Sequence, residues 1–229
     1  MNLLEFKDKM CASSKPKTVN LRIQAINKYL EFTKQNHLKL SFIKIRQMHF
    51  FENVISNADY EFLKNSLAKD NNLKWHFIVR FLAATGARVS ELVQIKIEHV
   101  NAGYIDMYSK GGKTRRIYIP KALINDVNPY IATLKYNHGY LFQNSMHKPL
   151  TTRGIAHELK KLSRLYMMND TVVYPHSFRH RFAKNFLDSH NDIALLSDLL
   201  GHESIETTRI YLRKTSFEQR EIVDKIVLW

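Results

Sequence analysis

Apolar residues recur at the three-and-four spacing of amphipathic helices along most of the chain. The segment from Thr18 to about Gln35 predicts one such helix, and residues 38–55 are mixed in pattern, with a short helix and a linker expected there. The nearly all-apolar run Trp75–Ala84 predicts a buried helix that ends at Thr85-Gly86, followed by a short helix over Val89–Ile95. Further helices are expected at roughly 59–69, 121–136, 152–167, 177–188, 192–200, 204–212 and 215–227.

One segment follows a different period. Tyr104, Asp106 and Tyr108 alternate with Ile105, Met107 and Ser109, and residues 117–119 form a second short apolar run. Between them, Ser109-Lys110-Gly111-Gly112-Lys113 contains paired glycines that permit a tight turn, so the segment predicts a β-hairpin. The expected fold class is therefore mainly α with a small antiparallel β-hairpin or sheet. We place the domain boundary near residue 55, which gives an N-terminal segment of residues 1–55 and a main domain of residues 56–229.

Composition limits the class of protein. A chain of 229 residues with 45% apolar side chains suits one good-sized domain, or a full domain plus a small one. Its one cysteine, Cys11, cannot form an internal bridge, which favours a reducing, intracellular setting. A run of about 18 uncharged apolar residues, as a membrane helix needs, is missing from the sequence. We expect a soluble cytoplasmic protein.

The net charge indicates a partner. Lys and Arg number 35 against 21 Asp and Glu, which gives +14, and residues 1–50 alone hold 10 basic and 3 acidic side chains. Such an excess can serve solubility or attract a ribosome or membrane surface. It also favours a polyanion, because neutralising phosphates releases condensed counterions. Nucleic acid is the partner that we favour.

Four local patterns carry candidate chemistry. They are, in chain order, Thr85-Gly86-Ala87-Arg88-Val89-Ser90-Glu91-Leu92, Lys110-Gly111-Gly112-Lys113, His176-Ser177-Phe178-Arg179-His180, and Gly201-His202-Glu203 followed by Thr207-Thr208 and Tyr211. Each has an ordinary explanation when taken singly. In this order and at these intervals they resemble the tyrosine recombinase (phage integrase and Xer) family over about residues 56–213. The resemblance implies that family's catalytic-domain fold, preceded here by a short helical N-terminal domain.

Two arginines are candidate phosphate ligands. Taken alone, Arg88 reads as a surface arginine paired with Glu91. A guanidinium fork can also hold two non-bridging oxygens of a phosphate. Attack on a phosphodiester builds charge on those oxygens, and fixed cations stabilise it. The resemblance assigns Arg88 and Arg179 this role of clamping the scissile phosphate.

A histidine precedes the second arginine on the same expected helix. His176 and Arg179 are three apart, so a helix places both on one face, although an exposed helix start has the same spacing. The resemblance makes His176 a catalytic base or proton relay near the nucleophile. We expect the neighbouring His180 and Arg181 to be structural residues or phosphate contacts, outside the catalytic set.

The last pattern supplies the nucleophile. Alone, His202 would be a hydrogen-bonding residue at a helix junction, and Tyr211 would be one core or surface aromatic among the 11 tyrosines. The resemblance makes His202 a donor to the attacked phosphate and makes Tyr211 the nucleophile. A phenol has a pKa near 10, so it needs neighbouring cations or a base to attack at neutral pH.

Basic residues in and after the hairpin turn are candidates for the remaining roles. A basic turn is often only a solvated or phosphate-touching loop. The leaving 5′-oxygen needs a proton, and a hairpin lysine can supply it as general acid. The resemblance places that role on Lys110, with Lys113 as the reserve choice. Lys113, Arg115 and Arg116 are then candidates for contact with the DNA backbone.

The two ends of the chain are less well matched. Members of the family usually carry a longer, four-helix core-binding domain, so we expect residues 1–55 to be an abbreviated form of it or the chain to be a fragment. Lys15, Lys17 and Arg22 are candidate DNA contacts in this segment. The segment after Tyr211 is amphipathic and either folds onto its own domain or, as often in the family, docks into a neighbouring protomer. We favour docking, in a homotetramer assembled on double-stranded DNA with inverted-repeat core sites.

The predicted activity is site-specific DNA recombination through a 3′-phosphotyrosyl intermediate on Tyr211, leading to integration, excision, inversion or dimer resolution. A type IB topoisomerase-like relaxase and a non-enzymatic DNA-binding protein are the alternatives. We expect neither metal nor cofactor, since the sequence offers no carboxylate cluster of the two-metal type, no Gly-x-x-x-x-Gly-Lys-Ser/Thr loop and no Cys/His zinc pattern. The expected location is the cytoplasm, at the nucleoid.

Overall fold

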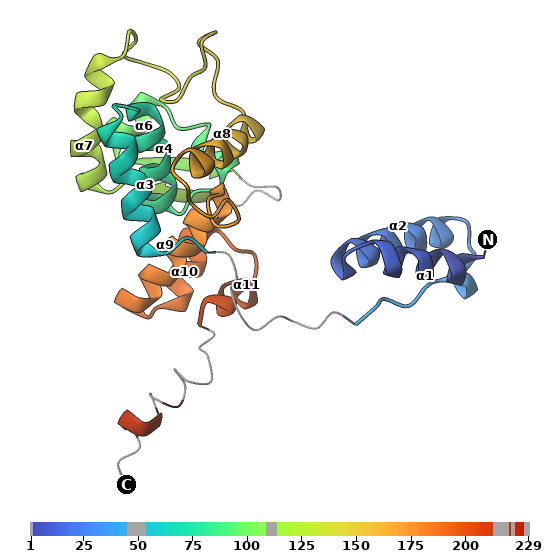
Figure 1. Ribbon diagram of the computed structural model, residues 1–229. Coiled ribbons are helices and arrows are strands. Elements are labelled where there is room, and N and C mark those ends of the chain that lie inside the picture. The colour runs from blue at the N-terminus through green and yellow to red at the C-terminus, as the bar shows by residue number, and fades with distance from the viewer. Residues whose placement is uncertain (1, 45–53, 109–113, 213–219, 221–222, 227–229) are drawn as a thin grey trace. The chain divides into compact units, whose positions relative to one another are not determined.

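The chain divides into two compact units in the computed structural model, Met1–His49 and Phe50–Trp229 (Figure 1). The structure describes residues 2–44, 54–108, 114–212, 220 and 223–226. Each unit has its own apolar core, and each is described by itself below. The assignment of residues 1–55 as a core DNA-binding segment stays a prediction.

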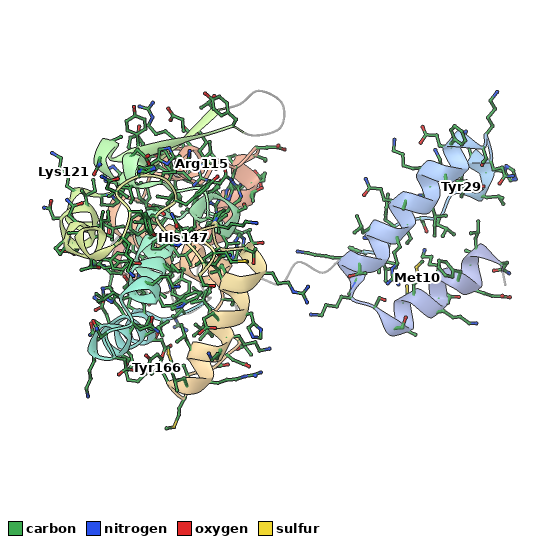
Figure 2. The ribbon with its side chains drawn as sticks, turned by 90° about the horizontal axis from the view of Figure 1, so that it is seen from above. Met10, Tyr29, Arg115, Lys121, His147 and Tyr166 are labelled. Atoms are coloured by element: carbon green, nitrogen blue, oxygen red, sulfur yellow. The ribbon has the colours of Figure 1, made fainter. Side chains whose placement is uncertain are left out.

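The first unit is a pair of helices, α1 (Leu3–Ser13) and α2 (Pro16–Phe32), followed by a 3₁₀ turn, η1 (Asn36–Leu38). Helix α1 was not expected from the sequence. Its start is fixed by a capping box in which Asn2 and Glu5 exchange side-chain-to-backbone hydrogen bonds. Met10 is buried in the small core of this unit, between the two helices in Figure 2.

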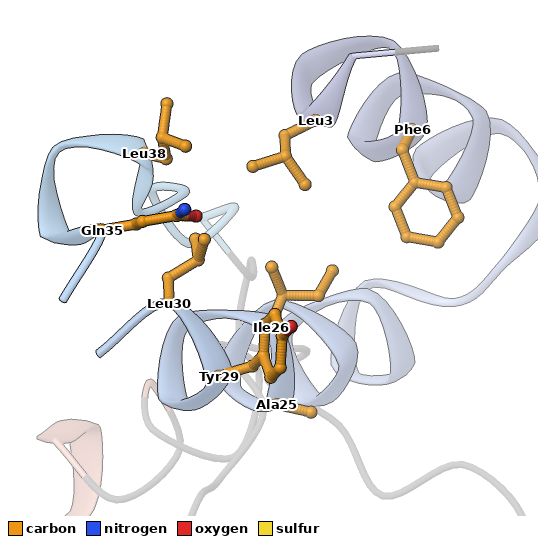
Figure 3. Close-up of a pocket in the computed structure, with 8 residues that line it drawn as sticks. All are labelled: Leu3, Phe6, Ala25, Ile26, Tyr29, Leu30, Gln35 and Leu38. Carbon is orange, nitrogen blue, oxygen red and sulfur yellow. The ribbon is translucent and has the colours of Figure 1, made fainter. Parts of the chain in front are cut away.

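An apolar pocket opens between the same helices (Figure 3). Leu3 and Phe6 of α1 point across it toward Ile26 and Tyr29 of α2. Tyr29 is 66% exposed, so this face of the helix pair leaves a large aromatic side chain in solvent.

The second unit holds the remaining elements. Its helices are α3 (Asn57–Lys69), α4 (Leu73–Thr85), α5 (Val89–Leu92), α6 (Ile97–Ala102), α7 (Lys121–Thr133), α8 (Thr152–Leu165), α9 (Pro175–His190), α10 (Ile193–Leu200) and α11 (Ile205–Arg209), with a 3₁₀ turn η2 (Ile210–Leu212). Helix α4 is the most deeply buried, as its nearly all-apolar sequence predicts, and it packs against α3, α5, α7 and α9. Helix α9 in turn contacts α8, α10 and η2, which brings distant parts of the chain together.

The sheet is a two-stranded antiparallel hairpin of β1 (Tyr104–Tyr108) and β2 (Thr114–Tyr118). Ile105 pairs with Ile117, and both side chains are buried. The turn between the strands, residues 109–113, lies outside the described residues, and so do the predicted general acid Lys110 and its alternative Lys113.

The expected fold class, mainly α with one small antiparallel hairpin, is confirmed. Helix α6 was not expected, because its six residues are too few to show a clear apolar period. The helix expected at 215–227 falls largely outside the described residues. In the part of the chain that the structure covers, every helix is too short or too polar to cross a bilayer.

Candidate active site

The turn between α4 and α5 positions Arg88. Helix α4 ends at Gly86, which has φ +60° and so adopts the left-handed conformation that favours glycine. A Cβ at this position would also lie 2.5 Å from a ring carbon of Phe182 in α9. Both the backbone conformation and the lack of space therefore require glycine at this position. The turn places Arg88 at the N-terminus of α5.

A buried carboxylate organises the neighbouring cations. The Glu91 side chain accepts hydrogen bonds from the Arg88 backbone N–H at 2.6 Å and from Arg88 Nη1 at 2.9 Å. It also accepts two from Nη1 of Arg115, at 2.8 and 3.0 Å. Glu91 is only 7% exposed, so its pairing with the buried Arg115 forms largely out of water, whereas Arg88 reaches it from a partly exposed position.

Arg115 projects from β2 into the protein, where the hairpin meets the helices (Figure 2). It is 8% exposed, and its Nε donates to the carbonyl of Leu199 near the end of α10 at 2.9 Å. Gly201, with φ +60°, lies against the same side chain, and a Cβ there would be 2.3 Å from Arg115 Cδ. The predicted contact of Arg115 with DNA is not supported by this placement, because the guanidinium is buried and already paired with Glu91.

Arg179 is the largest fully buried side chain of the described residues, at 1% exposed. Its Nη1 donates to the carbonyl of Gly86 at 2.7 Å, and its Nη2 donates to the carbonyl of Leu200 at 2.6 Å. These oxygens belong to the C-terminal ends of α4 and α10, where the helix dipole is negative and favours a cation. Burial, followed by the charges of Arg115 and Arg88, lowers the pKa of Arg179.

His202 connects Arg179 to the segment that carries the tyrosine. Its Nε2 lies 3.1 Å from Arg179 Nη2, and its Nδ1 lies 2.7 Å from the hydroxyl of the buried Thr208. Since a guanidinium only donates, Nε2 is the acceptor and the ring proton is assigned to Nδ1. Burial and the nearby Arg179 and Arg88 lower the pKa of His202 to about 4, so the ring is neutral at pH 7.

Tyr211 lies in η2 with its hydroxyl 2.8 Å from Nδ1 of His180 in α9. The ring of His180 meets that of His176, one helical turn earlier, at a centroid distance of 4.6 Å. Burial raises the pKa of Tyr211 to about 12, against a smaller opposing effect of Arg179. Burial, followed by the charges of His176 and Arg179, lowers the pKa of His180 to about 4.

The group of side chains around Glu91 and Arg179 carries excess positive charge. Among the described residues, the guanidiniums of Arg88, Arg115 and Arg179 have one carboxylate partner between them, that of Glu91. The side chain of Arg88 is 40% exposed, and its Nη2 donates to the carbonyl of Gly201 at 3.1 Å. The arrangement suits a phosphate group, since it offers fixed cations, a neutral imidazole and a phenol within one site. Within the described ranges, the structure has no group of three or more His, Cys, Asp or Glu placed to hold a metal ion.

The structure thus brings together five of the six residues predicted to be catalytic. Contacts link Arg88 to the Gly201 turn, and Arg179 to His202. Through His180, His176 is linked to Tyr211. The sixth, Lys110, is outside the described residues, and the catalytic roles themselves remain predictions.

Four residues of the site make contacts that the sequence did not indicate. Glu91 was noted only as a partner of Arg88, Arg115 was placed on the DNA, Thr208 had no role, and His180 was set apart as structural. One signal was available for His180, because it follows His176 by four residues and shares its helix face.

The other predicted DNA contacts lie at the surface. Lys15, Lys17 and Arg22 are exposed at the start of α2, with Arg22 Nη1 donating to Ser14 Oγ at 3.3 Å. Arg116 pairs with Asp106 across the hairpin and stacks on the Tyr104 ring at 3.9 Å. Its outward position leaves it accessible, in contrast to the neighbouring Arg115.

Comparison with known proteins gives a consistent result. The phage integrase family matches residues 53–217. The tyrosine recombinase XerA of Pyrococcus horikoshii is 32% identical over 218 residues, covering 93% of this chain and 74% of the relative. A tyrosine recombinase of Agathobacter rectalis is 30% identical, with 97% of this chain and 80% of the relative covered.

Solved structures share the fold. A crystal structure of XerA recombinase superposes with a TM-score of 0.64 at 22% identity, covering 99% of this chain and 82% of that one. XerH site-specific recombinase bound to its difH substrate gives a TM-score of 0.72 at 22% identity, with coverages of 97% and 69%. The chain therefore belongs to the phage integrase family and is a tyrosine recombinase of the Xer type, one of the enzymes that transfer DNA strands.

Proposed function

We propose that the chain cleaves and rejoins DNA at specific sites through a 3′-phosphotyrosyl intermediate on Tyr211. One observation carries the proposal: the Tyr211 hydroxyl is held by a hydrogen bond in a site that also contains Arg88, Arg179 and His202. A phenol next to fixed cations is the arrangement that nucleophilic attack on a phosphodiester requires.

In this mechanism the scissile phosphate enters the positive site beside Arg88, whose guanidinium is partly exposed. Tyr211 Oη attacks phosphorus, and the 5′-oxygen leaves. Arg88 and Arg179 stabilise the charge that builds on the non-bridging oxygens. Lys110 is proposed as the acid that protonates the leaving oxygen. The phosphotyrosyl ester conserves the bond energy, so a 5′-hydroxyl can reverse the step on the same or another strand.

His202 is proposed to donate to the attacked phosphate. In the structure its Nε2 accepts from Arg179, so it must carry a proton there when it donates to a phosphate. The Thr208 hydroxyl makes this possible, because a hydroxyl can either accept from Nδ1 or donate to it. The ring can then exchange tautomers without changing position.

Double-stranded DNA is the proposed partner. XerH in the solved structure is bound to a difH substrate, and the Tn1549 transposon integrase is bound to transposon right end DNA. For this chain we propose inverted-repeat core sites and a homotetramer on DNA, in the cytoplasm at the nucleoid. The reaction would serve integration, excision, inversion or dimer resolution.

The first unit is proposed to contribute phosphate contacts through Lys15, Lys17 and Arg22. Binding should then weaken steeply as salt rises, since each neutralised phosphate adds about 0.9 to the slope of log K against log salt. Replacing all three by Gln should lower that slope by about 2 to 3 units in a fluorescence anisotropy titration. An unchanged slope would show that these side chains do not touch the backbone.

The C-terminal segment is proposed to join protomers. Deleting residues 217–229 should reduce multimer formation on DNA, measured by light scattering. Unchanged assembly would remove this role from the segment and leave the catalytic proposal intact.

The direct test traps the covalent intermediate on a nicked suicide substrate built from inverted repeats that flank the gene. The native chain should form a denaturant-resistant adduct that is absent in Tyr211→Phe. Arg88→Ala should abolish the adduct while leaving binding largely intact, whereas equal loss of both would indicate a structural role. Binding without any adduct would favour a non-enzymatic DNA-binding protein, and an adduct that persists in Tyr211→Phe would mean another nucleophile.

A further inference from the structure

Two histidines on α9 stand near the nucleophile, and the structure distinguishes them. Nδ1 of His180 lies 2.8 Å from the Tyr211 hydroxyl, within hydrogen-bond reach. The contact described for His176 is with the ring of His180, at a centroid distance of 4.6 Å and an interplanar angle of 74°. The family resemblance assigns the catalytic base to His176, whereas the geometry points to His180.

The surroundings of His180 favour a neutral ring that can accept a hydrogen bond. His176 and Arg179 face it from its own helix, His202 from the segment after α10, and Tyr211 from η2. Burial is the main reason that the imidazole is neutral, and the charges of the basic groups act in the same direction. A neutral imidazole has one unprotonated nitrogen, and we assign the ring proton to Nε2, so that Nδ1 accepts the hydrogen bond from the Tyr211 hydroxyl.

We propose that His180 is a catalytic residue that takes the phenolic proton of Tyr211 during DNA cleavage and returns it during rejoining. The inference rests on the proposed function and names a further residue of the same site. As the bond from Tyr211 Oη to phosphorus forms, the Oη–H bond breaks and its proton moves to Nδ1 of His180. The bond from phosphorus to the 5′-oxygen breaks, and that oxygen takes a separate proton from the general acid, for which Lys110 is proposed.

The timing of the transfer follows from acidity. Burial makes the Tyr211 phenol a weak acid and the His180 imidazole a weak base, with pKa values of about 12 and about 4. Full transfer before attack is therefore unfavourable. The phenol becomes far more acidic as its oxygen bonds to phosphorus, and the bound phosphate, being anionic, raises the basicity of the ring. The proton consequently moves in the transition state, as general base catalysis requires.

The decisive variant is His180→Asn. An asparagine Oδ1 occupies nearly the position of a histidine Nδ1, so it can still accept the Tyr211 hydrogen bond, but it is not a base. We expect single-turnover adduct formation on the suicide substrate to slow by about 10²- to 10⁴-fold at pH 7, the usual range for a general base. The native rate should be nearly flat from pH 6.5 to 9, whereas the His180→Asn rate should rise about tenfold per pH unit as solvent ionises the phenol.

Matched variants separate the explanations. His176→Asn should keep the flat profile, and His157→Asn, which changes an exposed histidine on α8, should leave the rate unchanged. A His180→Asn rate that equals the native rate, or that falls by the same factor at every pH, would overturn the proposal. A rising profile in His176→Asn in place of His180→Asn would assign the base to His176.

Chemical rescue gives an independent measurement that a purely structural role would not produce. His180→Ala should regain adduct formation in proportion to added imidazole, and Tyr211→Phe should not. If imidazole has no effect on His180→Ala while its DNA binding and thermal melting remain native, the proposal fails. Failure of the proposed function itself would look different, because the native chain would then form no adduct at any pH.

Discussion

Replacing Arg115 by Met should destabilise the second unit more than any surface arginine does. The side chain is 8% exposed, and its Nη1 holds both oxygens of a carboxylate that is itself buried. Methionine preserves much of the aliphatic volume but leaves Glu91 with one cationic partner, Arg88. It also removes the Nε donor to the carbonyl of Leu199.

The magnitude follows from these contacts. Breaking a buried ion pair by removing one partner costs about 3–5 kcal/mol. Arg88 still neutralises Glu91 and two nearby cations lose a like-charge neighbour, which lowers the cost, while the unpaired Leu199 carbonyl adds about 1–3 kcal/mol. We expect a net loss of about 3 kcal/mol, which for a unit of this size lowers Tm by roughly 6–12 °C.

Urea denaturation followed by tryptophan fluorescence measures the loss, because Trp75 and Trp229 both belong to the second unit. Arg116→Met is the matched control, since its side chain is 45% exposed and its pair with Asp106 lies at the surface, where water and salt screen the charges. A loss in Arg115→Met no larger than in Arg116→Met would refute the reasoning. It would mean that Glu91 is adequately neutralised by Arg88 alone.

Two further outcomes are expected. Gly201→Ala should cost about 2–4 kcal/mol in the same denaturation assay, because strain at φ +60° combines with a Cβ placed 2.3 Å from Arg115 Cδ. Gly139→Ala, with φ +83° but nothing within 4 Å, should cost only the strain, and equal losses would show that the close approach relaxes freely. His180 and His202 have pKa values of about 4, below the ordinary 6.5, so the unfolded chain binds protons that the folded chain does not between about pH 6.5 and 4. The stability that these two histidines contribute should therefore be complete above pH 6.5 and fall as the pH drops toward 4. The measurement is the decrease in Tm from pH 7 to pH 5, which should be larger in the native chain than in a His180→Asn/His202→Asn variant. An equal decrease in the two proteins would contradict this.

The sequence predicted most of the elements of the second unit because their apolar period is long and regular. Helix α4 is the clearest case, with seven buried residues in one short run. Helix α1 was missed although Asn2 and Glu5 form a capping signature, because its apolar period is weak. Helix α6 is too short for a period to emerge, and only its glycine C-cap, Gly103, marks its end.

The site was predicted less evenly. Spacing along one helix could place His176 near Arg179, but it could not decide which of two histidines faces Tyr211, since that depends on how η2 packs against α9. The burial of Arg115 could not be predicted for a similar reason. Its partners, Glu91 and Leu199, are 24 and 84 residues away in the chain, so only the tertiary fold shows that the guanidinium is buried.

The backbone at the end of α10 links the assembly of the arginine cluster to the folding of this helix. Consecutive carbonyls of Leu199, Leu200 and Gly201 accept hydrogen bonds from three different arginines, and His202 follows directly. Any local unfolding of α10 therefore withdraws all three anchors, and the histidine with them, in a single event. A molecule that is partly unfolded there, during synthesis or under heat stress, does not hold the three arginines together. On the proposed mechanism such molecules should not cleave DNA, so cleavage would be restricted to chains that have finished folding.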